Sequence, residues 1–155
     1  MTPSPPLEPR AARRMACIAM LLLAMTPAFA APPLRASDAW IRWLPAHLPA
    51  GGYLRIDNPS SQALRLIGAR SDAYAKVMLH RTLDRGGSTT MEPVTTVEVP
   101  AQGSLRLEPG GLHLMLMEPL RPIHPGDQVG LTLLFEGGTT LAADFTVRPA
   151  NAEAR

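Results

Sequence analysis

The sequence predicts an all-β protein, an antiparallel β-sandwich or barrel with Greek-key connections. Pro and Gly interrupt nearly every stretch, and few segments keep the i, i+3, i+4 apolar spacing of a helix over three turns. Short runs with strand-like composition recur instead about every eight to twelve residues, with turn-forming residues between them. Short strands at this spacing are typical of sandwich folds.

Turn-forming residues mark where the predicted strands end, because Pro, Gly, Asp, Asn and Ser favour the backbone angles of tight turns. The clearest turns are Asp57–Ser60, Arg85–Ser88, Glu108–Gly111, His124–Asp127 and Glu136–Gly138. In chain order, the predicted strands are Ala39–Trp43, Tyr53–Asn58, Ala63–Arg70, Lys76–Leu83, Thr89–Val94, Thr96–Val99, Ser104–Leu107, His113–Met117, Gln128–Phe135 and Thr140–Val147. Residues 151–155 are expected to form a C-terminal tail.

Residues 1–30 have the three parts of a secretory signal peptide. A basic segment with three arginines precedes the short apolar segment Ala16–Met25, and Ala28–Ala30 is a small-residue cleavage site. A transmembrane anchor is the alternative, but crossing a bilayer takes about twenty apolar residues. We therefore expect export to the periplasm by the Sec or the twin-arginine route, cleavage near Ala31, and one domain over residues 31–150 with no membrane anchor.

The exported chain is expected to have neither a thiol nor a strong net charge. Cys17 is the only cysteine and lies in the leader, which excludes disulfides, Cys-ligated zinc and a blue-copper centre. The full chain has a formal charge of +2, and the leader holds three Arg and one Glu, so about zero remains. Nucleic-acid binding needs a basic stripe and is not expected. No nucleophile elbow, phosphate loop or paired carboxylate stands out, so we expect no enzyme.

Two histidines and two methionines follow a spacing that indicates a metal site. The order is His80, ten residues, Met91, twenty-one residues, His113, one residue, Met115. Imidazoles and thioethers without a thiolate suit Cu(I) better than zinc, calcium or magnesium. The four methionines outside the leader all lie in or beside this pattern, which argues against their usual role as flexible core filler. The pattern predicts one Cu(I) per chain, bound by these four residues.

Strand periodicity can bring these ligands to one rim. His113 and Met115 point to the same face of a strand, as do Met78 and His80, because side chains alternate between faces. An intervening turn can return Met91 near His80, as in a hairpin. An exposed rim site with neutral ligands releases its ion easily, which suits carriage better than catalysis. Three neighbours are left open as helpers of the site, Met78, Met117 and His47, while His124 is expected to be solvated in its turn.

The motif resembles the signature of the PCuAC family of periplasmic copper chaperones, which is His, ten residues, Met, twenty-one residues, His, any residue, Met. This chain matches the signature without an insertion. Further segments that resemble the family are Ala39–Arg42, Tyr53–Asn58, Gly110–Met117 and Gly126-Asp127 before the strand that ends at Phe135. The resemblance covers nearly all of residues 35–148.

The resemblance implies a cupredoxin-like antiparallel Greek-key β-sandwich with one partly exposed Cu(I) site. It also implies delivery of copper to cytochrome c oxidase, most often for assembly of the Cu(A) centre, alongside Sco-type proteins. Some family members have Met directly after the first His, whereas Arg81 stands there in this chain and is expected to put a cation near the site. Some members carry a His- and Met-rich C-terminal extension that can hold Cu(II), and residues 151–155 do not resemble it.

Three other functions remain open at this point, and each predicts a different result. A periplasmic copper storage or resistance protein would bind copper without an oxidase client. A metal-free secreted interaction module would tolerate Ala at all four motif positions. A redox copper enzyme would need an open site and usually more imidazoles. We expect a monomeric periplasmic Cu(I) carrier.

Overall fold

Ten strands and one short 3-10 turn make up the regular structure of the computed structural model, which describes residues 33–45 and 48–152. They are β1 (Arg35–Arg42), β2 (Ala50–Asn58), β3 (Leu64–Ser71), β4 (Tyr74–Asp84), β5 (Thr89–Pro93), β6 (Val97–Val99), β7 (Gly103–Leu107), β8 (Leu112–Pro119), β9 (Gln128–Phe135), η1 (Glu136–Gly138) and β10 (Thr140–Arg148). Each strand predicted from the sequence overlaps one of these. The predicted leader, His47 and the last three residues lie outside the described residues.

The first strand departs most from its prediction. It begins at Arg35 instead of Ala39 and ends at Arg42 instead of Trp43. Asp38 has a positive φ of 53°, and the register with β2 shifts between Ser37 and Trp40, which is a β-bulge. The segment before the bulge has weak strand propensity of its own, and its pairing with β2 makes it a strand.

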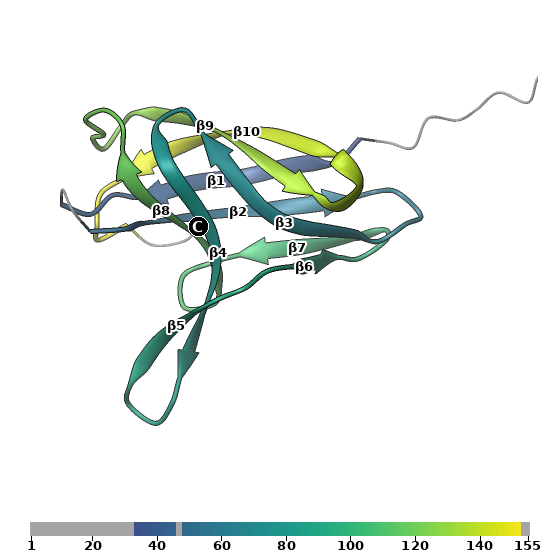
Figure 1. Cartoon of the computed structure of the whole chain (residues 1–155), viewed down its shortest axis with the longest axis horizontal. Coiled ribbons are helices and arrows are strands. Elements are labelled where there is room, and N and C mark those ends of the chain that lie inside the picture. Colours follow the sequence, from purple (N-terminus) through teal and green to yellow (C-terminus); the bar gives the residue numbers. More distant parts are fainter. Residues whose placement is uncertain (1–32, 46–47, 153–155) are drawn as a thin grey trace, which may run out of the picture.

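The ten strands belong to one sheet that curls into two layers. The order is β5-β4-β8-β2-β1-β10-β9-β3-β6, and β7 also pairs with β2. The start of β2 pairs with β8 and its second half pairs with β7. Figure 1 shows β3, β9 and β10 lying in front of β1 and β2. Among the described strands only β1 and β10 run parallel, so the predicted antiparallel β-sandwich is confirmed.

The core lies between the two layers and is built from alternating strand residues. Leu114 and Leu116 of β8 are buried, as are Leu131 and Leu133 of β9 and Phe145 of β10. Side chains alternate between faces along each strand. Met115, which lies between the two leucines of β8, and His113 before them therefore point to the outer face of the sheet.

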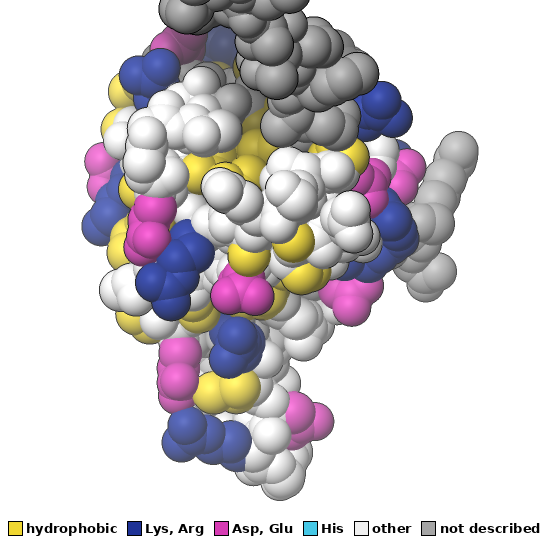
Figure 2. All heavy atoms as spheres, turned by 90° about the vertical axis from the view of Figure 1, so that its right-hand side faces the viewer, with side chains coloured by type: hydrophobic (Ala, Val, Ile, Leu, Met, Phe, Trp, Pro, Cys, Tyr) yellow, Lys and Arg dark blue, Asp and Glu magenta, His cyan; other side chains and the backbone are white. Residues whose placement is uncertain are grey.

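The hairpin of β4 and β5 extends beyond the body of the sandwich, as Figure 1 shows below its centre. All five residues of β5 are exposed. Figure 2 shows basic and acidic side chains interspersed over the end of the molecule that faces right in Figure 1. This view agrees with the balanced charge of the sequence. Within the described residues, no helix is long and apolar enough to span a membrane.

Candidate metal centre

The two motif histidines lie side by side on neighbouring strands. His80 of β4 is the direct register partner of His113 of β8. Their ring centroids are 6.1 Å apart, with an interplanar angle of 28°. Both side chains are buried, with 9% and 5% of their surface exposed. Directly paired residues of antiparallel strands share a face, so the sheet presents two imidazoles as one pair.

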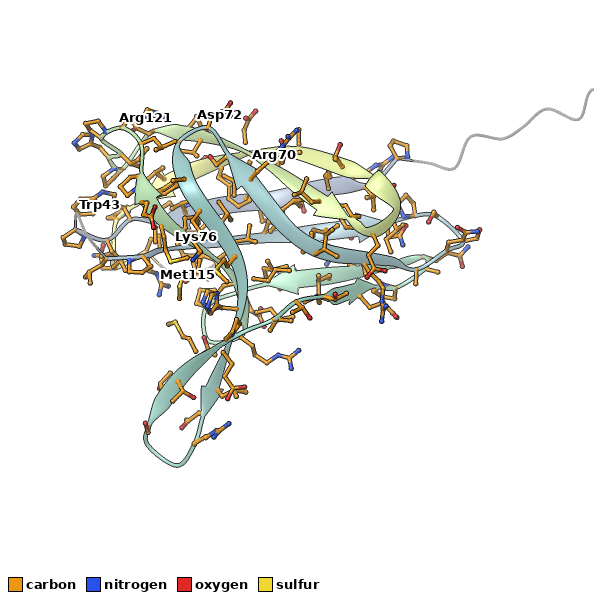
Figure 3. The ribbon with its side chains drawn as sticks, in the orientation of Figure 1. Trp43, Arg70, Asp72, Lys76, Met115 and Arg121 are labelled. Atoms are coloured by element: carbon orange, nitrogen blue, oxygen red, sulfur yellow. The ribbon has the colours of Figure 1, made fainter. Side chains whose placement is uncertain are left out.

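A pair of thioethers lies next to this pair of imidazoles. Met78 of β4 is opposite Met115 of β8, two residues from the histidines on each strand. The residues between them, Leu79 and Leu114, are buried in the core on the other face. The sequences Met-Leu-His on β4 and His-Leu-Met on β8 therefore place two imidazoles and two thioethers on one outer face. Figure 3 labels Met115 in this region, beside β4.

Met91 lies farther from the histidines than the other predicted ligands. It is on β5, opposite Thr82 of β4, with 55% of its surface exposed. It nevertheless lines the same cleft as His113 and Met115. The structure thus places His80 beside His113, and His113 two residues from Met115. Of the four predicted ligands, His113, Met115 and Met91 line the cleft, with Met91 on the projecting hairpin.

Hydrogen bonding determines which nitrogen of His113 is free to bind a metal. Its Nδ1 lies 3.1 Å from the carbonyl oxygen of Gly111. A carbonyl only accepts, so Nδ1 carries the proton and donates it. The lone pair is then on Nε2, which is left as the nitrogen that can bind a metal. A ligating histidine commonly donates its other ring N–H to a carbonyl in this way.

His80 has a buried nitrogen that is available for bonding. Its Nδ1 is buried and has no hydrogen-bond partner among the described residues. Burial lowers the pKa of His80, and His113 and Lys76 lower it further. The Met78 backbone raises the pKa of His80, but by less than burial lowers it. The neutral imidazole, which is the form that binds metals, is therefore favoured.

Aromatic and cationic side chains that were not predicted as part of the site surround it. The Tyr53 ring lies 6.5 Å from that of His113 and 4.6 Å from that of Trp40, centroid to centroid. The guanidinium of Arg42 lies 5.5 Å from both the Trp40 and the Tyr53 ring centroids. Burial raises the pKa of Tyr53, against the effect of Arg42, so the phenol stays neutral. Only the strand register reveals these neighbours, since they are far from the motif in sequence.

The charges around the site differ from the sequence expectation. Arg81 is paired with Leu112, so it points to the face opposite His80 and is not the cation beside the site. The cation on β4 next to these donors is instead Lys76, which is opposite Met117, one residue pair beyond Met78 and Met115 (Figure 3). Arg42 is the one formally charged side chain among the described residues that line the cleft.

The donor set of the site is that of a soft metal ion. The described residues contain no group of three or more His, Cys, Asp and Glu side chains that could hold a metal. Zinc sites are usually built from such groups. His124 is exposed in its turn, as expected, and its backbone N–H donates to Asp127. Two neutral imidazoles beside thioethers remain, which suit Cu(I).

Comparison with known proteins links this fold to copper-binding domains. The sequence model of the family described as "Putative lipoprotein LpqE-like" matches residues 34–147. "Putative lipoprotein Lxx21020" of Leifsonia xyli subsp. xyli is 32% identical over 118 residues, which are 76% of this chain and 70% of that protein.

Solved structures that share the architecture include two of copper-bound proteins. The solution structure of Cu(I)-DR1885 from Deinococcus radiodurans has a TM-score of 0.61 and 32% identity, covering 85% of this chain and 89% of that chain. The copper-bound PCuAC domain from PmoF2 has a TM-score of 0.63 and 22% identity, covering 78% and 97%. The cupredoxin-like sandwich predicted from the sequence is thereby confirmed.

Proposed function

Because the chain belongs to the LpqE-like family and has the fold of PCuAC domains, as its motif predicted, we propose that it is an exported Cu(I) carrier. One ion binds to His80, His113 and Met115, and Met91 of the hairpin completes the site. The observation that carries this proposal is the direct pairing of His80 with His113, two residues from Met115.

The chemistry of the donors supports a carrier of Cu(I). Thioethers have no proton to lose and bind Cu(I) readily, whereas zinc prefers imidazole, thiolate or carboxylate. The neutral phenol of Tyr53 offers no phenolate to Cu(II). Met91 is exposed at the edge of the cleft, where an acceptor can reach the ion. These features suit binding and transfer, and we propose no enzymatic turnover.

We place the site of action in the periplasm, after a signal peptide over residues 1–30 is removed and a monomeric mature chain starting near Ala31 is released. We propose the copper-receiving subunit of cytochrome c oxidase as the client, with assembly of its Cu(A) centre as the outcome. Sco-type proteins act with it. The resemblance of the motif to copper chaperones of this class supports this role.

Anaerobic titration with Cu(I) against a chromophoric competitor tests the proposal. We expect tight one-to-one binding by the mature chain. The His113→Ala/Met115→Ala variant should lose more than about 100-fold in affinity, since removing even outer-shell partners costs about 10- to 100-fold. His124→Ala is the matched control, because His124 is exposed in a turn, and it should bind as the wild type does. Equal effects of both variants, or no competitive binding, would overturn the proposal.

Delivery is tested separately from binding. Deleting the gene should lower the copper content of cytochrome c oxidase when copper is scarce, and the wild-type protein should restore it while the His113→Ala/Met115→Ala variant should not. Normal oxidase together with copper sensitivity would indicate storage or resistance in place of delivery.

A further inference from the structure

Met78 is a soft donor on the outer face of β4 that the proposed ligand set does not use. It is half-buried and lies directly opposite Met115, a proposed ligand, on the neighbouring strand. The sequence alone leaves its role open, because flexible packing is the common role of methionine. Its register with Met115 gives a reason to assign it a second role.

The four side chains of the two pairs form the corners of a rectangle. Directly paired residues have Cβ atoms about 5 Å apart, and residues two apart on a strand are separated by about 6.7 Å. The centre of the rectangle made by Met78, His80, His113 and Met115 is therefore about 4 Å from each Cβ atom. Imidazole and thioether side chains reach that far, so one ion above the centre can contact all four.

Met91 is less well placed for the same position. It lies one strand beyond β4 and two residues farther along it, opposite Thr82. In an unbent sheet its Cβ atom is about 10 Å from the midpoint between His80 and His113, given strands about 4.8 Å apart. Met91 already lines the cleft with His113 and Met115, so the hairpin brings it closer than a flat sheet would. Its register still leaves it farther from His80 than Met78 is.

We propose that Met78 is a second thioether ligand, which gives Cu(I) two positions in one site. Both positions use His80, His113 and Met115. Met78 completes the inner position on the β4–β8 pair, and Met91 completes the outer position at the exposed edge. The ion exchanges one thioether for the other, with no change in its oxidation state or total charge. This inference rests on the proposed function and deepens it.

The two positions give the carrier a closed and an open form. In the inner position the ion lies above half-buried and buried side chains, away from the exposed hairpin. In the outer position it lies beside Met91, where an acceptor ligand can displace an exposed thioether. Movement farther along β4 and β8 is opposed, because Lys76 is the partner of Met117 and its ammonium repels a cation.

Three leucine substitutions test the proposal: Met78→Leu, Met91→Leu and, as the matched control, Met117→Leu. Met117 is a half-buried thioether on the same face of β8, one pair beyond Met115. Leucine keeps the volume and removes the sulfur, which is usually well tolerated. The mature protein carries each change alone, and Met91→Leu is also combined with each of the other two. Cu(I) affinity is measured by competition, and the sulfur atoms bound to copper are counted by X-ray absorption.

We expect Met91→Leu to retain two sulfur ligands, because Met78 replaces the lost thioether. Adding Met78→Leu should leave one sulfur and weaken binding at least about fivefold more than the two single changes predict, since ligands of one ion are strongly coupled. Adding Met117→Leu should change neither the sulfur count nor the affinity. A Met91→Leu variant with one sulfur, additive effects of Met78→Leu, or equal effects of Met117→Leu would each overturn the proposal.

The experiment separates this inference from the proposed function. If the wild type binds Cu(I) tightly and the His113→Ala/Met115→Ala variant does not, the proposed carrier function is supported. If Met78→Leu then shows no coupled effect, the inner position alone is refuted. If the wild type itself does not compete for Cu(I), both the carrier function and the inner position are refuted.

Discussion

Gly51 is expected to be required for the position of Tyr53 beside the candidate metal centre. Gly51 of β2 is opposite Met115, and the phenol ring of Tyr53 lies over it. A Cβ atom on Gly51 would come within 2.9 Å of Tyr53 Cζ and closer still to its hydroxyl. The Gly51→Ala variant must therefore move the ring. The ring is held by Trp40, whose centroid is 4.6 Å away, and by Arg42.

The cost of this movement follows from the contacts that it disturbs. Overpacking a well-packed site costs about 1–3 kcal/mol, and loss of an aromatic pair costs about 0.5–1.5 kcal/mol. Replacing Gly by Ala also stabilises the folded state by up to about 1 kcal/mol, because it reduces the conformational entropy of the unfolded chain. We expect a net loss of about 1–2 kcal/mol in the free energy of unfolding. For a domain of this size, that lowers Tm by roughly 4–8 °C.

Thermal and urea denaturation of the metal-free protein measure this loss, and near-UV circular dichroism reports the Trp40–Tyr53 pair. The matched control is Gly130→Ala in β9, where the nearest atom to a new Cβ is Asp144 Oδ1 at 3.8 Å. That variant should be neutral or slightly more stable. If Gly51→Ala were as stable as Gly130→Ala, with an unchanged near-UV spectrum, the argument that Gly51 makes room for Tyr53 would be refuted.

Three further perturbations have defined outcomes. Burial lowers the pKa of His80, so the unfolded state binds the proton more readily than the folded state does. The stability of the metal-free protein should therefore fall as pH falls below about 6.5, and it should fall less in the His80→Gln variant. Equal pH profiles of the two proteins in urea melts would contradict this. Leu114→Ala should cost about 2–5 kcal/mol in urea unfolding, since Leu114 is fully buried beneath the site, and a loss below 1 kcal/mol would mean that the core collapses around it. Trp43→Phe should cost about 1–2 kcal/mol in the same assay, because Trp43 Nε1 donates a 2.7 Å hydrogen bond to the Ile123 carbonyl; no loss would show that water replaces the bond.

The secondary structure could be predicted from the sequence because its signals are local. Turn residues such as those at Arg85–Ser88 and Glu108–Gly111 restrict the backbone by themselves, and the strands between them follow. The start of β1 was missed, since its residues have weak strand propensity and form a strand only by pairing with β2. Pairing depends on a partner far along the chain, which no local pattern reveals.

In the candidate site too, some features follow from local sequence and others from strand pairing. That His113 and Met115 share a face follows from the two-residue period of a strand. That His80 pairs with His113, and Met78 with Met115, depends on the register of β4 and β8. A slip of one residue would turn one strand's donors toward the core.

By itself, the sequence determined the family to which the chain belongs and the strands that carry the candidate site, and it predicted the residue types of that site and the soft metal that they favour. The tertiary structure alone decided that Met78 faces Met115, that Met91 lies at the exposed edge, and that Tyr53 and Arg42 are neighbours of the site while Arg81 is not. The physical reason is that spacing along a strand is set by backbone geometry. Contact between strands is instead set by the register that buries the core of the whole sandwich.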